Sequence, residues 1–219
     1  MAMEWHYRWL SYLWPVRVKK MKSLMGDLEI AWENGRKVLN SAHGNQSFGS
    51  LHHVWQATFN AIGLKERYVG PILMLGLGAG SILHILRNEL FIEAPLTIIE
   101  MDPVMIRLAR DEFRTLDDKA RIIEGDATIQ VHSIDKAFSL ITVDLFHDLD
   151  LAAGSDTSGF AKALATRCDR NGIVCFNTVG YDPLSSRRCD KVLMHLKQHF
   201  AKVTEFRFEG VNRVFIAEP

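Results

Sequence analysis

The chain has few cysteines, no excess of charge of either sign and no long apolar run. Its three cysteines (Cys168, Cys175 and Cys189) form no Cys-x-x-Cys pair. Because an odd number suits no disulfide framework, we expect a reducing, cytoplasmic location. Lys+Arg and Asp+Glu both number 26, so no net field favours nucleic acid. No apolar run could span a bilayer, and Glu4 and Arg8 interrupt the aromatic N-terminus where a signal peptide would be apolar, so we expect no membrane partner.

Several catalytic signatures are also missing. No Gly-x-Ser-x-Gly motif occurs, which removes the usual signal of a nucleophile-elbow hydrolase. None of the four tyrosines has a lysine four residues later, so the catalytic pair of short-chain dehydrogenases is absent. His195 and His199 have the spacing of two metal ligands on one helix face, but no motif supplies a third ligand, and we expect no metal.

Residues 1–24 predict an N-terminal helical segment rich in aromatic and basic residues. Trp5, Trp9 and Tyr12 or Leu13 lie at helical spacing, and Pro15 ends the pattern. The basic residues follow: Arg17, Lys19, Lys20 and Lys22. We expect residues 3–14 to be helical and to pack within the chain or across a possible homodimer. A helix on a membrane surface or against another partner is the alternative.

Residues 25–64 predict a small β-hairpin lid followed by a helix. The runs Leu28–Trp32 and Lys37–Leu39 flank Asn34-Gly35, which is a strong hairpin signal. Helical periodicity then extends from about Leu51 to Ile62.

Residues 65–219 alternate between strands and helices. The expected parallel strands are continuous apolar runs, as in a sheet covered on both faces: Ile72–Leu75, Leu96–Glu100, Ala120–Ile123, Leu140–Asp144 and Ile173–Phe176. Helices are expected over 159–168 and 185–200. The connection between Val203–Phe208 and Val211–Ala217 is too short for a parallel crossover, so these strands must pair antiparallel. The fold class is therefore α/β: a doubly wound, Rossmann-like, seven-stranded sheet with an antiparallel last strand, preceded by a small N-terminal hairpin.

A glycine loop follows the first strand of this sheet. Gly76, Gly78 and Gly80 allow a sharp turn and a close approach of a ligand to the backbone. The next helix begins at once, and its free N–H groups face a polar group. Glu100 lies about 20 residues further on, where the ribose hydroxyls of a nucleotide are usually bound.

Acids end three successive strands. Glu100 could pair with two ribose hydroxyls, and Asp126 could accept a hydrogen bond from an adenine amino group. Asp144 ends an apolar strand where a reacting group would lie. Because ligands of such sheets bind outside the carboxyl ends of the strands, these acids predict a cofactor site.

The chain resembles the spermidine-synthase-like branch of the S-adenosylmethionine-dependent methyltransferase fold over residues 28–217. The motifs that carry the resemblance are Leu73-Met-Leu-Gly-Leu-Gly-Ala-Gly80, Ile98-Ile-Glu-Met-Asp-Pro103, Ile123-Glu-Gly-Asp-Ala127, Phe138-Ser-Leu-Ile-Thr-Val-Asp144 and Asn212-Arg-Val-Phe-Ile216.

The resemblance implies S-adenosylmethionine or its decarboxylated form as cofactor, bound by Gly76, Gly78, Gly80, Glu100, Met101, Asp126 and Ala127. It implies Asp144 as the acid that faces a small-molecule acceptor. Gln46, His147 and Asp148 would be further contacts of that acceptor.

The chain departs from true aminopropyltransferases at acidic positions. Their first loop resembles Gly-Gly-Gly-Asp-Gly, whereas here Ala79 stands at the acid position. Their Asp-x-x-Asp-Pro motif keeps only its first acid, with His147 at the second. A polyamine carries several cations and needs carboxylates to pair with them, so the sequence predicts little putrescine aminopropyltransferase activity.

The most consistent function is transfer of a methyl or aminopropyl group from an adenosyl sulfonium to a small nucleophile, with Asp144 orienting or deprotonating the acceptor. Three alternatives stay open: a genuine spermidine synthase, a non-catalytic cofactor-binding or assembly protein, and an NAD-dependent oxidoreductase. The dinucleotide fingerprint of the last asks for Gly or Ala where Ser81 stands.

Overall fold

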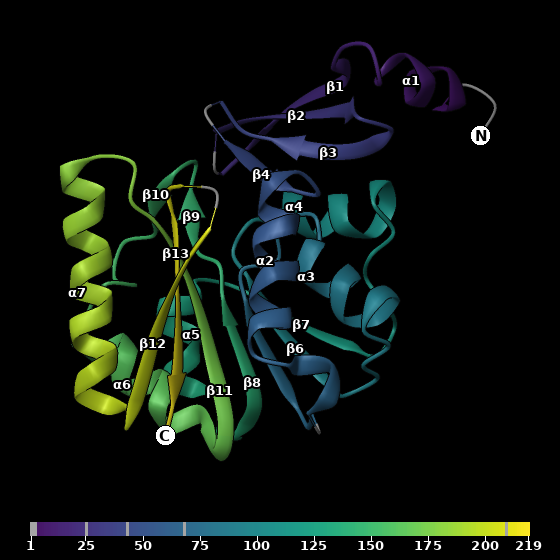
Figure 1. Cartoon of the computed structure of the whole chain (residues 1–219). Coiled ribbons are helices and arrows are strands. Elements are labelled where there is room, and N and C mark those ends of the chain that lie inside the picture. Colours follow the sequence, from purple (N-terminus) through teal and green to yellow (C-terminus); the bar gives the residue numbers. More distant parts are fainter. Residues whose placement is uncertain (1–3, 25, 43, 68, 209) are drawn as a thin grey trace.

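The computed structural model describes residues 4–24, 26–42, 44–67, 69–208 and 210–219, with the side chains of Glu4 and Gln46 left out. A small N-terminal sheet lies over the carboxyl ends of the parallel strands of a larger sheet, which has helices on both faces (Figure 1).

The N-terminal segment is helical only in its first part. Helix α1 spans Glu4–Leu10, and strand β1 spans Val16–Ser23. The prediction of one helical segment over 1–24 is therefore wrong for its second half. The expected helix over 3–14 ends already at Leu10, with residue 3 outside the described residues. Pro15 then cannot continue a helix, β-branched Val16 and Val18 favour a strand, and the following strand supplies hydrogen-bond partners.

The lid sheet consists of β1 to β4 in sequence order, and its remaining strands are β2 (Gly26–Glu33), β3 (Arg36–Asn40) and β4 (Asn45–Ser47). The expected hairpin is present, with Trp32 paired to Lys37 across the turn. Asn34 and Gly35 have φ of 49° and 76°. Positive φ at both central residues is typical of a type I′ turn, whose twist matches that of the flanking strands. The domain boundary expected between residues 24 and 25 therefore falls between β1 and β2, inside the lid sheet.

The main sheet has seven strands in the order β12-β13-β11-β8-β5-β6-β7. Its strands are β5 (Ile72–Leu75), β6 (Leu96–Glu100), β7 (Ala120–Glu124), β8 (Phe138–Val143), β11 (Cys168–Val179), β12 (Lys202–Phe208) and β13 (Asn212–Glu218). Strands β5, β6, β7, β8 and β11 pair in parallel, and β13 lies antiparallel between β11 and β12. The predicted doubly wound sheet with its antiparallel last strand is confirmed.

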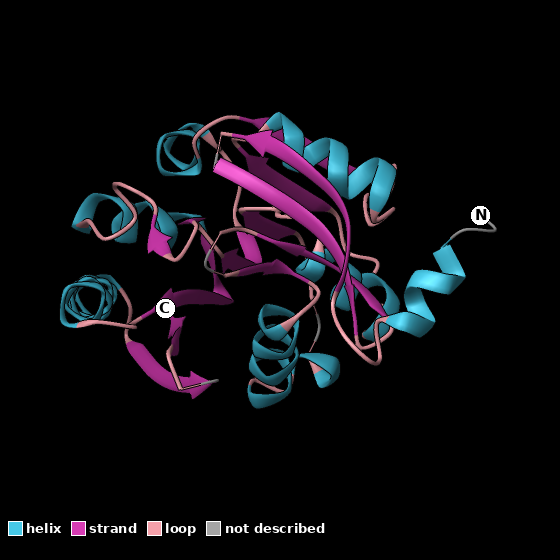
Figure 2. Cartoon of the chain, turned by 90° about the horizontal axis from the view of Figure 1, so that it is seen from above, coloured by secondary structure: helices cyan, strands magenta, loops and turns pink. Residues whose placement is uncertain are grey.

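Helices cover both faces of the main sheet, as the view from above shows (Figure 2). One face carries α5 (Ala127–Gln130) with η4 (Val131–Ser133), α6 (Ser158–Arg167) and α7 (Pro183–His199). The other carries α2 (Ser50–Ala61) with η1 (Leu64–Glu66), α3 (Ser81–His84) with η2 (Ile85–Glu89), and α4 (Pro103–Arg107) with η3 (Leu108–Glu112). Helix α2, expected to belong to the lid, thus packs on the main sheet through Val54, Trp55 and Phe59.

Two short elements were not predicted. Strands β9 (Phe146–His147) and β10 (Asp150–Leu151) form a hairpin directly after β8. Asp148 at its turn has φ of 59°, a left-handed conformation that Asp tolerates better than most residues. This hairpin brings residues 145–151 to the carboxyl ends of the strands.

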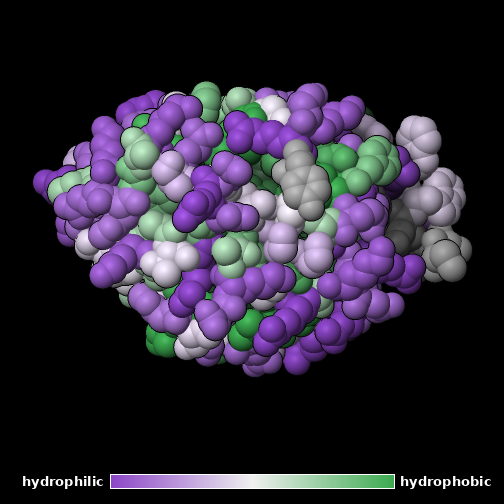
Figure 3. Space-filling view, turned by 90° about the horizontal axis from the view of Figure 1, so that it is seen from below, coloured by the Kyte–Doolittle hydropathy of each residue, from purple (hydrophilic) through white to green (hydrophobic). Residues whose placement is uncertain are grey.

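The lid sheet packs on the main domain through an apolar contact of its own. Leu28, Ile30 and Leu39 meet Ala79 of the glycine loop and Met105 of α4. In addition, the backbone N–H of Leu24 donates to Asp102 Oδ2 at 3.1 Å. The end of the molecule away from the lid is mostly hydrophilic, with small separate apolar groups (Figure 3). Among the described residues, no helix has the length and apolarity needed to cross a bilayer.

Candidate active site

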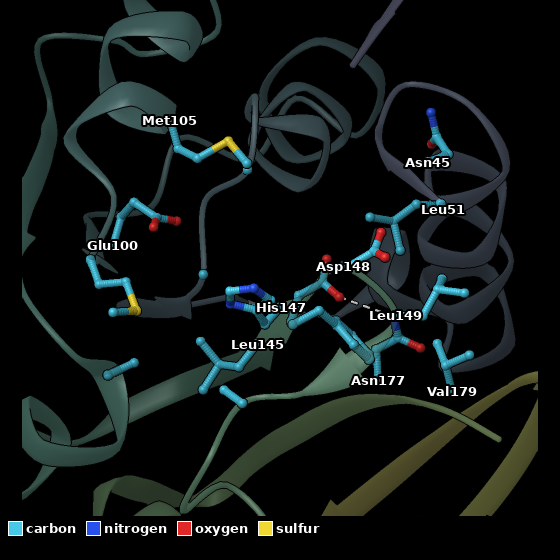
Figure 4. Close-up of a pocket in the computed structure, with 18 of the residues that line it drawn as sticks. Asn45, Leu51, Glu100, Met105, Leu145, His147, Asp148, Leu149, Asn177 and Val179 are labelled. Atoms are coloured by element: carbon cyan, nitrogen blue, oxygen red, sulfur yellow. Dashed lines mark hydrogen bonds between the residues drawn. The ribbon is translucent and has the colours of Figure 1, made fainter. Parts of the chain in front are cut away.

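A cavity of about 650 Å³ lies between the lid and the carboxyl ends of β5, β6 and β8. Pockets of roughly 300–1,000 Å³ are typical of small-molecule sites. Glu100 and Met105 lie at one end of the cavity, and Leu51, Leu149, Asn177 and Val179 at the other, with His147 between them (Figure 4). Of the residues expected to bind a cofactor, Gly76, Gly78, Glu100, Met101, Asp126 and Ala127 line it.

The three loop glycines meet different structural needs. All three have positive φ: 89° at Gly76, 55° at Gly78 and 87° at Gly80. A Cβ at Gly76 would collide with the backbone carbonyl of Asp144, so this glycine lets β5 and β8 end side by side. Gly80 does not line the cavity, and a Cβ there would collide with the Thr115 hydroxyl. Gly80 therefore packs within the fold, while Gly76 and Gly78 also face the cavity.

Glu100 holds the glycine loop in place. Its Oε2 accepts the backbone N–H of Leu77 and its Oε1 that of Asp102, both at 2.8 Å. Burial raises the pKa of Glu100, and the N–H groups of Asp102, Leu77 and Gly78 oppose that rise. A carboxylate has about four acceptor positions, so after these three N–H groups one position remains for a donor from the cavity.

Asp126 is the N-cap of α5 and also lines the cavity. Its Oδ1 accepts the backbone N–H of Thr128 at 2.8 Å and the Thr128 hydroxyl at 2.7 Å. Among the described residues no hydrogen bond to its Oδ2 is found. The cap therefore fixes the side chain with one oxygen left for a ligand.

Asp144 lies at the cavity wall, bonded to two neutral donors. The Trp55 indole N–H donates to its Oδ2 at 3.1 Å, and the Asn177 amide donates to its Oδ1 at 3.0 Å. Asn212 in turn donates to Asn177 Oδ1 at 3.1 Å, which fixes the orientation of that amide. Burial raises the pKa of Asp144, and the bonds from Asn177 and Trp55 partly offset the rise. A carboxylate with a raised pKa is a better proton acceptor.

The residues expected to contact an acceptor lie in the hairpin and the lid. His147 and Asp148 line the cavity, and Asp148 accepts a hydrogen bond from the Ser41 hydroxyl at the edge of the lid. Gln46 belongs to β4, but its side chain lies outside the described residues. His195 and His199 lie on α7, where they contact Gln198 and Ser158 rather than the cavity.

The charged side chains that line the cavity are acidic. Four carboxylic acids line it: Glu100, Asp126, Asp144 and Asp148. Among its described lining residues there is no lysine or arginine, and His147 is the sole histidine. This electrostatic environment favours a cationic ligand and disfavours an anionic one.

Three contributors to the site were not predicted from the sequence. Trp55 occupies an apolar position of a helix, where nothing marks it as a partner of Asp144. Asn177 directly follows the apolar run 173–176 near the carboxyl end of β11, a signal that could have been used. Tyr181 lines the cavity, and its hydroxyl donates to Asp150 at 2.8 Å.

A buried polar cluster connects the lid to the glycine loop behind the cavity. The Ser47 hydroxyl accepts the backbone N–H of Ala79 at 2.8 Å, and the Ser81 hydroxyl accepts that of Phe48 at 3.3 Å. His52 Nδ1 lies 2.6 Å from Ser81 Oγ, and its Nε2 lies 2.8 Å from Glu89 Oε1. We call His52, Ser81 and Glu89 the clamp.

Comparison with solved structures gives the fold a clear set of relatives. A probable spermidine synthase from Corynebacterium glutamicum is similar with a TM-score of 0.71 and 17% identity over 92% of this chain and 79% of that one. Spermidine synthase from Thermotoga maritima is similar with a TM-score of 0.67 and 15% identity, over 92% of this chain and 72% of that one. Human methyltransferase-like protein 13, in complex with SAH, is similar with a TM-score of 0.63 and 22% identity, over 78% of this chain and 82% of that one.

No family model matches the chain, and no curated protein matches it in sequence. At these identities the likeness concerns the fold, which includes the N-terminal extension because the spermidine synthases align over 92% of the chain. The fold of the chain is therefore similar to that of spermidine synthases and of a methyltransferase-like protein, with a Rossmann-like sheet.

Proposed function

We propose that the protein is an S-adenosylmethionine-dependent transferase. The observation that carries the proposal is the cavity at the carboxyl ends of the strands, lined by four carboxylic acids and, among the described residues, by no lysine or arginine. An adenosyl sulfonium is a cation and fits this charge. A dinucleotide such as NAD carries a diphosphate, which would face these acids without a basic partner.

The donor end of the cavity suits an adenosyl group. Glu100 keeps one acceptor position for a ribose hydroxyl, and Asp126 Oδ2 is available for an adenine amino group. Met101 and Ile99 supply apolar walls, and Gly76 and Gly78 leave the backbone open to the ligand. S-adenosylmethionine, when bound, supplies an activated carbon on its sulfonium sulfur.

The remaining catalytic tasks fall to the chain. Asp144 accepts a proton from the acceptor and orients it, because its carboxylate is fixed by Trp55 and Asn177. The lid sheet closes the cavity above this group and limits access of water. His147 and Asp148 contact the acceptor from the hairpin, and Gln46 is a further candidate contact from the lid.

Methyl transfer fits the site better than aminopropyl transfer. Ala79 stands where an aminopropyltransferase carries an acid; it is fully buried, and its N–H is bonded to Ser47. Of the cavity acids, Glu100 is bonded to the glycine loop and Asp148 accepts a bond from Ser41. The ammonium groups of a diamine acceptor would therefore lack dedicated carboxylates, whereas a methyl acceptor needs none.

Calorimetry with the purified protein tests the proposal. S-adenosylmethionine, S-adenosylhomocysteine and methylthioadenosine should bind, and NAD should not. Binding of NAD together with no response to the three adenosyl compounds would overturn the proposal in favour of an oxidoreductase.

A further inference from the structure

The two ends of the cavity differ in chemistry. The end around Glu100 carries carboxylates together with the open glycine backbone. The opposite end, beyond Asp144, is formed by Leu51, Leu149, Val179 and Val211. Figure 4 shows Leu51, Leu149 and Val179 at the same end of the cavity as Asn177 and Asp148. The end that receives the acceptor is therefore mainly apolar.

The polar groups at the apolar end are neutral or already bonded. Asn177 donates to Asp144 and accepts from Asn212. The Tyr181 hydroxyl donates to Asp150, and Asp148 accepts from Ser41. An ammonium group placed among these apolar side chains would lose its hydration, and the one carboxylate beside them apart from Asp144, that of Asp148, is already bonded to Ser41. An anion would meet no lysine or arginine among the described lining residues.

We infer that the acceptor is a small, uncharged molecule with an apolar body and one weakly acidic hydroxyl, as in a phenol or an enol. This inference rests on the proposed function. The apolar body packs against Leu51, Leu149 and Val179, and the hydroxyl faces Asp144. A weakly acidic O–H suits one carboxylate with a raised pKa, because the proton moves between groups of more closely matched acidity.

The transfer balances without any further reagent. The O–H bond of the acceptor breaks, and its proton goes to the Asp144 carboxylate. The acceptor oxygen forms a new bond to the methyl carbon, while the carbon–sulfur bond breaks and its electron pair stays on sulfur. The products are a neutral ether and a neutral thioether, and Asp144 later releases its proton to water.

Three phenols with the same ring and different tails test this assignment. They are 4-propylphenol, which is neutral, tyramine, which is cationic, and 4-hydroxyphenylacetate, which is anionic. In the presence of saturating S-adenosylhomocysteine, calorimetry should find 4-propylphenol bound at least about tenfold more tightly than either charged phenol, because a buried charge without a partner is costly. Putrescine should bind no better than tyramine. With S-adenosylmethionine, 4-propylphenol should be the phenol that is methylated fastest.

A variant with a matched control tests the position of the apolar end. Leu149→Asp should weaken binding of 4-propylphenol about tenfold or more and reverse the preference toward tyramine. Leu184→Asp, on the outside of α7 at a side chain 63% exposed, should change neither. S-adenosylhomocysteine should bind both variants as it binds the parent protein.

The outcomes separate the two proposals. If S-adenosylhomocysteine binds and tyramine, putrescine or the anionic phenol binds as tightly as 4-propylphenol, or no phenol binds, the acceptor class is wrong and the transferase proposal stands. If S-adenosylhomocysteine does not bind, the proposed function fails and the inference fails with it.

Discussion

The indole N–H of Trp55 donates to Asp144 Oδ2 at 3.1 Å, so a helix in front of the glycine loop holds the acid that ends β8. Trp55 is fully buried, and the residues are 89 positions apart in the chain. With the bond from Asn177 to the other oxygen, both carboxylate oxygens of Asp144 are bonded to neutral donors. A negative charge is thereby stabilised without a cation, which leaves the carboxylate able to take a proton.

Asp144 is expected to act as the base. Asp144→Asn keeps the shape of the side chain and removes its ability to accept the proton, so turnover should fall about 10²–10⁴-fold. The affinity for S-adenosylhomocysteine should hardly change, because Glu100 and Asp126 contact the adenosyl group in our proposal. Steady-state kinetics with 4-propylphenol and calorimetry provide the two measurements. Equal turnover by the Asn variant would refute the role.

The pH dependence of turnover should report on the same group. Protonated Asp144 cannot accept a proton, so activity is lost as the pH falls through its pKa. Burial raises that pKa, so the loss should occur above pH 3.8, the ordinary value for Asp. Trp55→Phe removes one hydrogen bond to the charged carboxylate, so the loss of activity on acidification should occur at still higher pH. Phe59→Leu, at a buried neighbour in α2 with no bond to Asp144, is the control and should leave that pH unchanged.

Glu100 should be required for binding of the donor. Glu100→Gln replaces one acceptor oxygen by an amide that cannot accept, which disturbs the bond to the Leu77 or Asp102 N–H and the contact with one ribose hydroxyl. We expect S-adenosylhomocysteine to bind more weakly by roughly 1.5–3 kcal/mol. Glu124→Gln, in the exposed last residue of the neighbouring strand β7, is the control. Unchanged affinity of the Glu100 variant would contradict the assignment.

Local signals in the sequence predict most of the fold. The apolar runs of the main sheet, the Asn34-Gly35 turn and the short Gly210 connection each determine an element within a few neighbouring residues. The prediction is wrong for residues 16–23, since a strand with four basic residues and little apolar periodicity gains its stability from pairing with β2. Its pairing partner, not its own sequence, determines its structure.

The candidate site is only partly visible in the sequence, for a related reason. Glu100, Asp126 and Asp144 stand at strand ends, and parallel strands bring such residues to one edge of the sheet. Trp55 reaches the site from a helix 89 residues before Asp144, and no local pattern predicts that contact. The apolar end likewise depends on the unpredicted hairpin β9–β10, which places Leu149 near Gly44 of the lid.

The exposed aromatic residues of the N-terminal segment should pack against a second copy of the chain. Ser11 ties the segment to the lid turn, since its hydroxyl accepts the Gly35 N–H at 2.9 Å, but Trp5 and Trp9 remain 54% and 69% exposed. Helix α1 projects away from the rest of the chain in both views (Figures 1 and 2). Exposed tryptophans are frequent anchors of interfaces.

Light scattering tests this homodimer. The protein should have the mass of a dimer, and Trp5→Ala with Trp9→Ala should shift it to a monomer. Ile129→Ala with Leu184→Ala, at side chains 65% and 63% exposed elsewhere, should leave the mass unchanged. If the parent protein is a monomer and the tryptophan variant instead loses binding to anionic liposomes, the membrane-surface alternative is right.

The clamp should make stability depend on pH between about 7.5 and 5.5. Burial lowers the pKa of His52 below 6.5, although Glu89 opposes the shift. The unfolded chain then takes up a proton at His52 more readily than the native one. The stability tied to His52 is therefore fully present above pH 6.5 and is lost as the pH falls toward the lowered pKa. Hydrogen bonds from Gln56 and His52 outweigh burial and lower the pKa of Glu89, so Glu89 titrates below this window.

Melting curves of the parent protein and of His52→Asn separate this group from the other histidines. The variant should be less stable at pH 7.5 by about 1–3 kcal/mol, because Ser81 or Glu89 loses a buried partner. Its stability should fall less than that of the parent between pH 7.5 and 5.5. His132→Gln, at an exposed histidine of η4, should keep the pH dependence of the parent. Because Ser81 of the clamp begins the helix after the glycine loop and also accepts the N–H of Phe48, next to the lid strand β4, the affinity of the parent for S-adenosylhomocysteine should decrease over the same interval and that of His52→Asn should not. A parent-like pH dependence of His52→Asn in both measurements would show that the clamp does not couple the lid to protonation.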